Sequence, residues 1–220
     1  AVASAFAAGV MEPTAHYTLG GEVAFLFYDR KAKAVRSVVG QGWAANNATI
    51  SRYMETWGEI PAGVLSTTVP GVISALLAML ASYGTMSFDQ VVRPALHFAQ
   101  QGFPTYQLLN RAIGTQERLN NLNKYPDSAR IFLPEGSPPV LGSLFIQKDL
   151  AKTLSLMARA EEQAIEKGLK KASGIQAARD AFYKGDIAHR MVESLEHLGA
   201  LYSYDDFAEY ESPMEEPIFY

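Results

Sequence analysis

The chain has 220 residues, of which 48% are hydrophobic and 19% are charged, and its formal net charge is −4. These values indicate a folded protein of one domain or slightly more, and the acidic balance gives no electrostatic reason to expect nucleic acid or an anionic membrane surface as a partner. The absence of cysteine excludes disulfides and thiolate chemistry, and no apolar run reaches the ~20 residues that a membrane span requires.

The chain opens on an apolar segment, residues 1–10 (AVASAFAAGV), which predicts a buried helix. A helix start usually carries Ser, Thr, Asp or Asn as a cap, and here Ser4 is the only candidate and lies inside the apolar run. The segment lacks a basic leader, so we interpret it as a core helix and not as a signal peptide. We expect that the extreme N-terminus lies before Ala1.

Two strands are predicted next, after the diglycine Gly20-Gly21. Residues 22–29 (EVAFLFYD) and 34–39 (AVRSVV) are rich in aromatic and β-branched side chains, and the polar DRKAK segment between them predicts a hairpin with a five-residue loop. Asn46 and Asn47 offer caps for a helix that follows.

The rest of the chain is predicted to be mainly helical. Helices are expected over residues 50–57, 69–84, 87–104, 147–167, 177–183, 186–199 and 203–210. Ser87, Asp186 and Ser203 are the expected caps, and Ser203 is followed by Asp206 in a capping-box pattern. Pro94 predicts a kink or two abutting helices.

Few residues carry the spacing of a catalytic or metal site. The histidines His16, His97, His189 and His197 show no metal-ligand spacing, and no GxSxG, GxGxxG or P-loop motif is present. The carboxylate pairs are interpreted as solvated helix faces and caps, because catalytic carboxylates need opposed geometry in a cleft. These pairs are Glu161-Glu162, Asp205-Asp206 and Glu215-Glu216.

The best local candidate for ligand binding is Gly40-Gln41-Gly42-Trp43, directly after a predicted strand. The glycines allow close approach of the backbone, while Gln41 offers an amide and Trp43 an aromatic wall. A tight turn with a packed tryptophan explains the same residues equally well. The residues alone therefore predict a mostly helical α/β or α+β domain with no complete catalytic set.

The order of several segments adds a resemblance to a known family. These segments are the opening AVASAFAAGVMEP, the diglycine before a strand ending in Tyr-Asp, VPGVISALLAMLASYG, VVRPALHFAQQGFP, and AFYKGDIAHRMV followed by LGALYSYDDFAEY. Together they resemble the large subunit of the γ-glutamyltranspeptidase family of N-terminal-nucleophile hydrolases, over nearly the whole chain. The resemblance implies an α+β fold, a four-layer αββα sandwich. Residues 1–220 would supply mainly the helices and part of the sheet.

The resemblance also implies where the chemistry lies. In this family a precursor cleaves itself, and the new N-terminal Thr of the small subunit is the nucleophile, with its own α-amine as base. This chain would then hold no catalytic residue, cofactor or metal, and its partners would be the small subunit and a small-molecule amide. The final residues, 215–220 (EEPIFY), would enter the central sheet. A dimer of heterodimers, and a periplasmic, extracellular or cytoplasmic location, stay open.

The chain departs from the family pattern at three places. True γ-glutamyl enzymes carry an Arg that pairs with the substrate α-carboxylate, and alignment on Ala44 places Gln41 there, with Gly42 and Trp43 beside it as expected substrate-binding residues. A neutral amide cannot form the charge-assisted, bidentate pair of an Arg. Glu22 stands where glutathione-type members often have another glycine. Residues 161–178 are longer than the usual link, which we interpret as surface decoration or an interface.

Three hypotheses follow from these observations. The first is an autoprocessed amidohydrolase or acylase whose substrate is not an ordinary γ-glutamyl compound. The second is a genuine γ-glutamyl hydrolase or transferase in which another cation, such as Arg36 or Arg52, binds the carboxylate. The third is a non-catalytic helical binding module.

Overall fold

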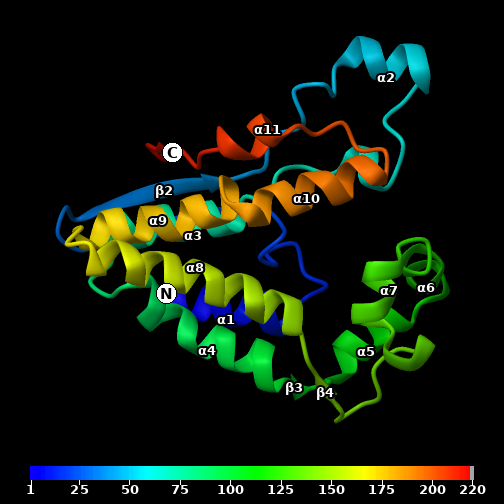
Figure 1. Cartoon of the computed structure of the whole chain (residues 1–220), viewed down its shortest axis with the longest axis horizontal. Coiled ribbons are helices and arrows are strands. Elements are labelled where there is room, and N and C mark those ends of the chain that lie inside the picture. Colours follow the sequence, from blue (N-terminus) through cyan, green and yellow to red (C-terminus); the bar gives the residue numbers. More distant parts are fainter. Residues whose placement is uncertain (219–220) are drawn as a thin grey trace.

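A small antiparallel sheet lies along one side of a helical layer in the computed structural model, which describes residues 1–218 (Figure 1). The helices are α1 (Val2–Met11), α2 (Ile50–Thr56), α3 (Val72–Tyr83), α4 (Phe88–Gln101), α5 (Gln107–Gly114), α6 (Gln116–Leu122), α7 (Pro126–Phe132), α8 (Lys148–Glu166), α9 (Lys171–Tyr183), α10 (Asp186–His197) and α11 (Tyr204–Ala208). The strands are β1 (Val23–Asp29), β2 (Ala34–Gly40), β3 (Phe103–Pro104), β4 (Leu144–Phe145) and β5 (Met214–Glu215).

Helix α3 lies at the centre of the helical layer because its sequence is apolar on every face. Its residues from Val72 to Leu77 are all buried, and it contacts α1, α9 and both long strands. Helix α8 packs against α4 and α9, and α1 packs against α4. The predicted helices over the first segment and over residues 69–84, 87–104 and 147–167 are therefore confirmed, within a few residues at each end.

The sheet has the order β1-β2-β5, with both pairs antiparallel. Asp29 pairs with Ala34, so the hairpin loop is residues 30–33, one residue shorter than expected. Side chains alternate across β1: Phe27 packs edge-on against Tyr83 of α3, whereas Leu26 is 69% and Tyr28 62% exposed. Helices thus cover one face of the sheet, and the other face presents apolar side chains without a cover from the described residues.

A second, smaller hydrophobic cluster lies at one end of the molecule, where α5, α6 and α7 lie between the paired short strands β3 and β4 (Figure 1). Its buried residues are Phe103, Leu109, Ile113, Leu133 and Phe145. The sequence predicted no helices between residues 105 and 131, so α5 to α7 are additions. The proline- and glycine-rich stretch 132–143 is a loop as predicted, apart from the end of α7 and a short 3-10 turn.

The helix starts agree only partly with the expected caps. The Ser87 side chain accepts from the Gln90 N–H as predicted, and Pro94 lies inside a single helix, so two abutting helices are excluded. Helix α2 is capped by Thr49, not by an asparagine, and Asp186 is the first helical residue of α10. At α11 the Asp206 carboxylate accepts from the N–H and the hydroxyl of Ser203.

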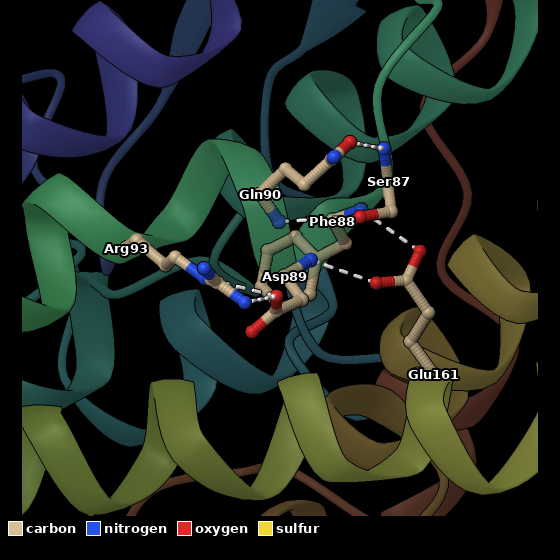
Figure 2. A network of polar contacts seen from close by, with 6 residues as sticks. All are labelled: Ser87, Phe88, Asp89, Gln90, Arg93 and Glu161. Atoms are coloured by element: carbon tan, nitrogen blue, oxygen red, sulfur yellow. Dashed lines mark hydrogen bonds and ion pairs between the residues drawn. The ribbon is translucent and has the colours of Figure 1, made fainter.

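The segment 161–178 is not surface decoration, because it forms the end of α8 and much of α9, which pack against each other and against the core. Glu161 is only 2% exposed. Its two carboxylate oxygens accept from the backbone N–H groups of Phe88 (2.8 Å) and Asp89 (2.7 Å), at the start of α4 (Figure 2). Of the two interpretations of the carboxylate pairs, as solvated helix faces and as caps, the solvated face is wrong for Glu161, whereas the cap is confirmed, because Glu161 accepts from the first N–H groups of α4. Glu162 is exposed.

The two ends of the described chain differ in structure. Helix α1 starts without a side-chain cap, as the sequence predicts. Beyond β5, Ile218 is 80% exposed and in no strand, while the expected strand residues Phe219 and Tyr220 lie outside the described residues. Within residues 1–218, no helix combines the length and apolarity that crossing a membrane requires.

Candidate functional site

An open cleft of about 2060 Å³ runs between the start of the sheet and the helices α8 and α10. At one end it is lined by Glu22 just before β1, Gln41 just after β2, and Thr67 and Thr68 from the segment before α3. Residues of α8 and α10 also line it, among them Arg159 and Arg190. The segments that meet at the first end are far apart in the sequence, and the hairpin and α3 bring them together.

The backbone of the loop after β2 is held by one close approach and two hydrogen bonds. A Cβ on Gly42 would lie 2.0 Å from the Val69 carbonyl oxygen, so only glycine permits this approach. The Val69 N–H donates to the Trp43 carbonyl (2.9 Å), and the Tyr210 hydroxyl donates to the Gln41 carbonyl (2.9 Å). The Gln41 side chain is left exposed at the cleft.

The three candidate binding residues are therefore placed differently. Gln41 lines the cleft, whereas Gly42 and Trp43 do not. The Trp43 ring packs edge-on against Tyr210 with centroids 5.3 Å apart, and the residue is 49% exposed. Gly42 acts through its backbone, because its N–H points back to Glu22.

Glu22 is half-buried at the same end of the cleft. Its Oε1 accepts from the Thr68 hydroxyl at 2.6 Å and from the Gly42 N–H at 3.3 Å. Within residues 1–218, Glu22 forms no ion pair. Its Oε2 accepts no hydrogen bond there, and this atom is not fully buried. Glu22 lines the cleft, and among the described residues both of its donors contact the same carboxylate oxygen.

A buried tyrosine pair supports the loop from behind. Tyr183 donates to the Pro70 carbonyl and accepts from the Ser74 N–H, and its ring lies 5.6 Å from the Tyr210 ring. Arg179 donates to the Tyr210 carbonyl and lies over the Tyr183 ring. Burial raises the pKa of Tyr210, and the charge of Glu22 adds to the rise, against the opposing effects of Ser212 and Arg179. Burial also raises the pKa of Tyr183, so both phenols stay protonated and act as donors at neutral pH.

The cations of the cleft lie along its helical wall. Arg159 of α8 and Arg190 of α10 both line it, while Arg36 and Arg52, the sequence candidates for a substituted cation, do not. Arg36 instead pairs with Glu216 at 2.8 Å. Among the described residues, no three side chains of the His, Asp and Glu types cluster as a metal site would require.

Sequence reasoning found Gln41 but did not single out Thr68 or Tyr210, and it treated Glu22 only as a departure from a pattern. Glu22 carried a usable signal: it is a charged residue between a diglycine and an apolar strand. No local sequence pattern marks Thr68 or Tyr210, because only the tertiary fold brings them close to the Gln41 loop.

Comparisons with known proteins place this geometry in context. A family model described as gamma-glutamyltranspeptidase matches residues 1–220. The chain is 34% identical, over 91% of its length, to a glutathione hydrolase-like proenzyme (YwrD) of Bacillus subtilis, and 31% identical, over 100%, to a glutathione hydrolase proenzyme of the same species. It spans 35% of the length of each of these relatives.

A solved structure agrees with the sequence comparisons. The Helicobacter pylori gamma-glutamyltranspeptidase superposes with a TM-score of 0.83 and 25% identity, over 99% of this chain and 58% of that one. This likeness confirms the expected fold of the N-terminal-nucleophile type, to which the chain contributes the helical layer and strands described above.

Proposed function

Because this chain belongs to the γ-glutamyltranspeptidase family, we propose that it is the large subunit of an autoprocessed amidohydrolase or acylase, with residues 1–220 part of one domain completed by a small subunit. The nucleophile is the N-terminal Thr of that small subunit. Gln41 lines the acyl pocket, with Gly42 and Trp43 shaping the loop that presents it. The substrate is an amide that is not an ordinary γ-glutamyl compound.

The reaction is acyl transfer in two steps. The Thr hydroxyl attacks the amide carbonyl while the α-amine takes its proton, and the C–N bond breaks as that proton passes to the leaving amine. Water then attacks the ester carbonyl, its proton passes through the same amine, and the free acid leaves with the Thr hydroxyl restored. No residue of this chain exchanges a proton in either step, so its role is to bind and orient the acyl group.

The observation that carries the proposal is the neutral Gln41 at the end of the cleft. A charge-assisted hydrogen bond contributes about 1.5–3 kcal/mol, against about 1 kcal/mol for a neutral one. A site with Gln41 in place of an Arg binds a substrate α-carboxylate more weakly, by about one order of magnitude for each 1.4 kcal/mol.

The test begins with intact masses and N-terminal sequences of every chain in the natively purified protein. We expect a second chain beginning with Thr, and turnover of acyl anilides that exceeds turnover of the γ-glutamyl anilide. The variant Gln41→Arg restores the cation, and we expect it to raise kcat/KM for the γ-glutamyl anilide about tenfold relative to wild type. High wild-type activity on the γ-glutamyl anilide, unchanged in the variant, contradicts the proposal.

A genuine γ-glutamyl hydrolase or transferase is the second candidate, and two observations favour it. A relative that matches over the whole chain is named a glutathione hydrolase proenzyme, and Arg159 and Arg190 supply cations to the same cleft. Loss of γ-glutamyl turnover in Arg159→Gln or Arg190→Gln would support this candidate. A single chain without a Thr-led partner would instead favour a non-catalytic binding module.

A further inference from the structure

Arg179 of α9 is a charged residue that is only 7% exposed and lies outside the lining of the cleft. Its guanidinium donates to the Tyr210 carbonyl and, at 3.4 Å, to the Ser74 hydroxyl. Within residues 1–218 its ion pair is with Asp180, and the N–O distance of that pair is 3.5 Å. Taking a guanidinium out of water costs free energy, and a buried ion pair can often be replaced by apolar side chains without loss of stability. Stability alone therefore does not require a cation at this position.

Two sets of contacts connect Arg179 to the loop after β2. The first runs through Tyr210, which accepts from Arg179 at its carbonyl and donates from its hydroxyl to the Gln41 carbonyl at 2.9 Å. The second runs through Tyr183, whose ring centroid lies 4.9 Å from the Arg179 guanidinium carbon and whose hydroxyl donates to the Pro70 carbonyl. One buried side chain thus contacts both tyrosines that support the loop.

The backbone segments that the two tyrosines hold are also in close contact with each other. A Cβ on Gly71, the residue after Pro70, would lie 2.1 Å from the Gly40 carbonyl oxygen and 2.8 Å from the Tyr210 hydroxyl oxygen. Because Gly40 directly precedes Gln41, the loop is supported at two successive carbonyls. Groups packed this tightly cannot shift independently, so a displacement of either tyrosine is passed to the Gln41 backbone.

We propose that Arg179 is a positioning residue, which holds Tyr210 and Tyr183 in the arrangement that orients Gln41 in the cleft. A planar guanidinium suits this role, because it can donate from its edge to the Tyr210 carbonyl while its carbon lies over the Tyr183 ring. The inference rests on the proposed function, since it takes Gln41 as a residue of the acyl pocket. It goes further by assigning the orientation of that residue to a buried cation outside the cleft.

The test compares Arg179→Met with Arg93→Met in the complete processed enzyme. Methionine keeps a long side chain but removes the charge and every donor. Arg93 is the matched control, because it is an exposed arginine of α4 whose side chain donates to Asp89 of the same helix. Turnover is measured on the acyl p-nitroanilide that the wild type hydrolyses fastest, per mole of folded, processed protein.

We expect kcat to fall about tenfold in Arg179→Met with little change in KM, because a misoriented acyl group still binds but reacts slowly. Arg93→Met should keep the wild-type values of both. If Arg179→Met does not fold, Arg179→Lys takes its place, since lysine keeps the charge without the planar fork of donors. We expect a severalfold loss of kcat in that variant.

A double-mutant cycle with Tyr210→Phe separates positioning from a general loss of structure. If Arg179 acts through Tyr210, both substitutions disturb the same support of Gln41. Tyr210→Phe should then lower kcat severalfold in the wild-type background and much less in the Arg179 variant. Independent damage to the fold would instead give additive effects on kcat.

The outcomes separate this inference from the function on which it rests. A wild-type kcat in the folded Arg179 variant, or additive effects of the two substitutions, overturns the role of Arg179 and leaves the amidase in place. A wild-type protein with no Thr-led second chain, or with no turnover of any acyl anilide, overturns the proposed function and this inference with it.

Discussion

Glu161 and Glu22 make the same kind of contact in opposite settings. Glu161 is almost completely buried, and each of its oxygens accepts a backbone N–H from the start of α4 (Figure 2). Glu22 is half-buried and lines an open cleft, and one of its oxygens takes both of its donors. A carboxylate whose oxygens are all engaged by the protein stabilises the fold, whereas one with a spare oxygen in a cleft is available to a ligand.

The largest effect is expected at the buried member of the pair. Glu161→Ala leaves two N–H groups of α4 without acceptors, and we expect it to lower the free energy of unfolding by about 3 kcal/mol. The measurement is chemical denaturation of the full two-chain protein, with Glu162→Ala as the exposed control. If both variants unfold at the same denaturant concentration, the claim that Glu161 stabilises the fold more than the exposed Glu162 is contradicted.

A smaller effect on stability, but a clear one on turnover, is expected at the cleft. Tyr210→Phe removes the donor to the Gln41 carbonyl and keeps the ring against Trp43, so we expect a loss of about 1 kcal/mol in stability and a severalfold fall in kcat/KM for the preferred anilide. Tyr204→Phe is the control, because its hydroxyl also donates to a carbonyl, that of Lys184, at 2.7 Å but at an exposed site. Equal kcat/KM values for the preferred anilide in the two variants would show that the Tyr210 hydroxyl does not contribute to the site.

The smallest effect is expected at Asp149, a carboxylate whose side chain is 47% exposed and paired with Arg130 and Lys152 at the surface. Arg130 and then Lys152 hold the pKa of Asp149 below its usual value. The stability that follows is present above the pKa of the unfolded carboxyl and is lost as the pH falls through the folded pKa. Asp149→Asn should cost about 1 kcal/mol or less at neutral pH and nothing in acid. Denaturation curves at the two pH values check this, and a loss as large as that of Glu161→Ala would contradict it.

The long elements of this fold are predictable from sequence because their patterns are strong. The apolar run before Gly84, the Ser87 cap and the aromatic-rich run from Val23 to Asp29 each identify an element without help from the rest of the chain. Helices α5, α6 and α7 are not, because each is a short helix whose apolar residues serve a separate small cluster. Their stability comes from packing more than from local preference.

Of the residues at the candidate site, the sequence identified Gln41 but not the residues that surround it in the fold. Gln41 stands between two glycines after a strand, a local signal that points to backbone approach. Its neighbours are Glu22, Thr68 and Tyr210, which come from three distant segments. A single sequence does not show which distant residues will be in contact in the fold. The interpretation of residues 161–178 as surface decoration was wrong for the same reason. Nothing near Glu161 in the sequence shows that this residue caps a helix that begins at Phe88.

The pairing of β2 with β5 has a consequence for the order of folding. Ser37 pairs with Glu215, so nearly the whole chain separates the two strands, while β1 and β2 are joined by a short loop. Closing so long a loop costs entropy that only an already assembled helical layer can offset. We therefore expect the hairpin to form early and β5 to join late. Until β5 pairs, the edge of β2 that faces away from β1 has unpaired N–H and C=O groups, which favours edge-to-edge association during refolding.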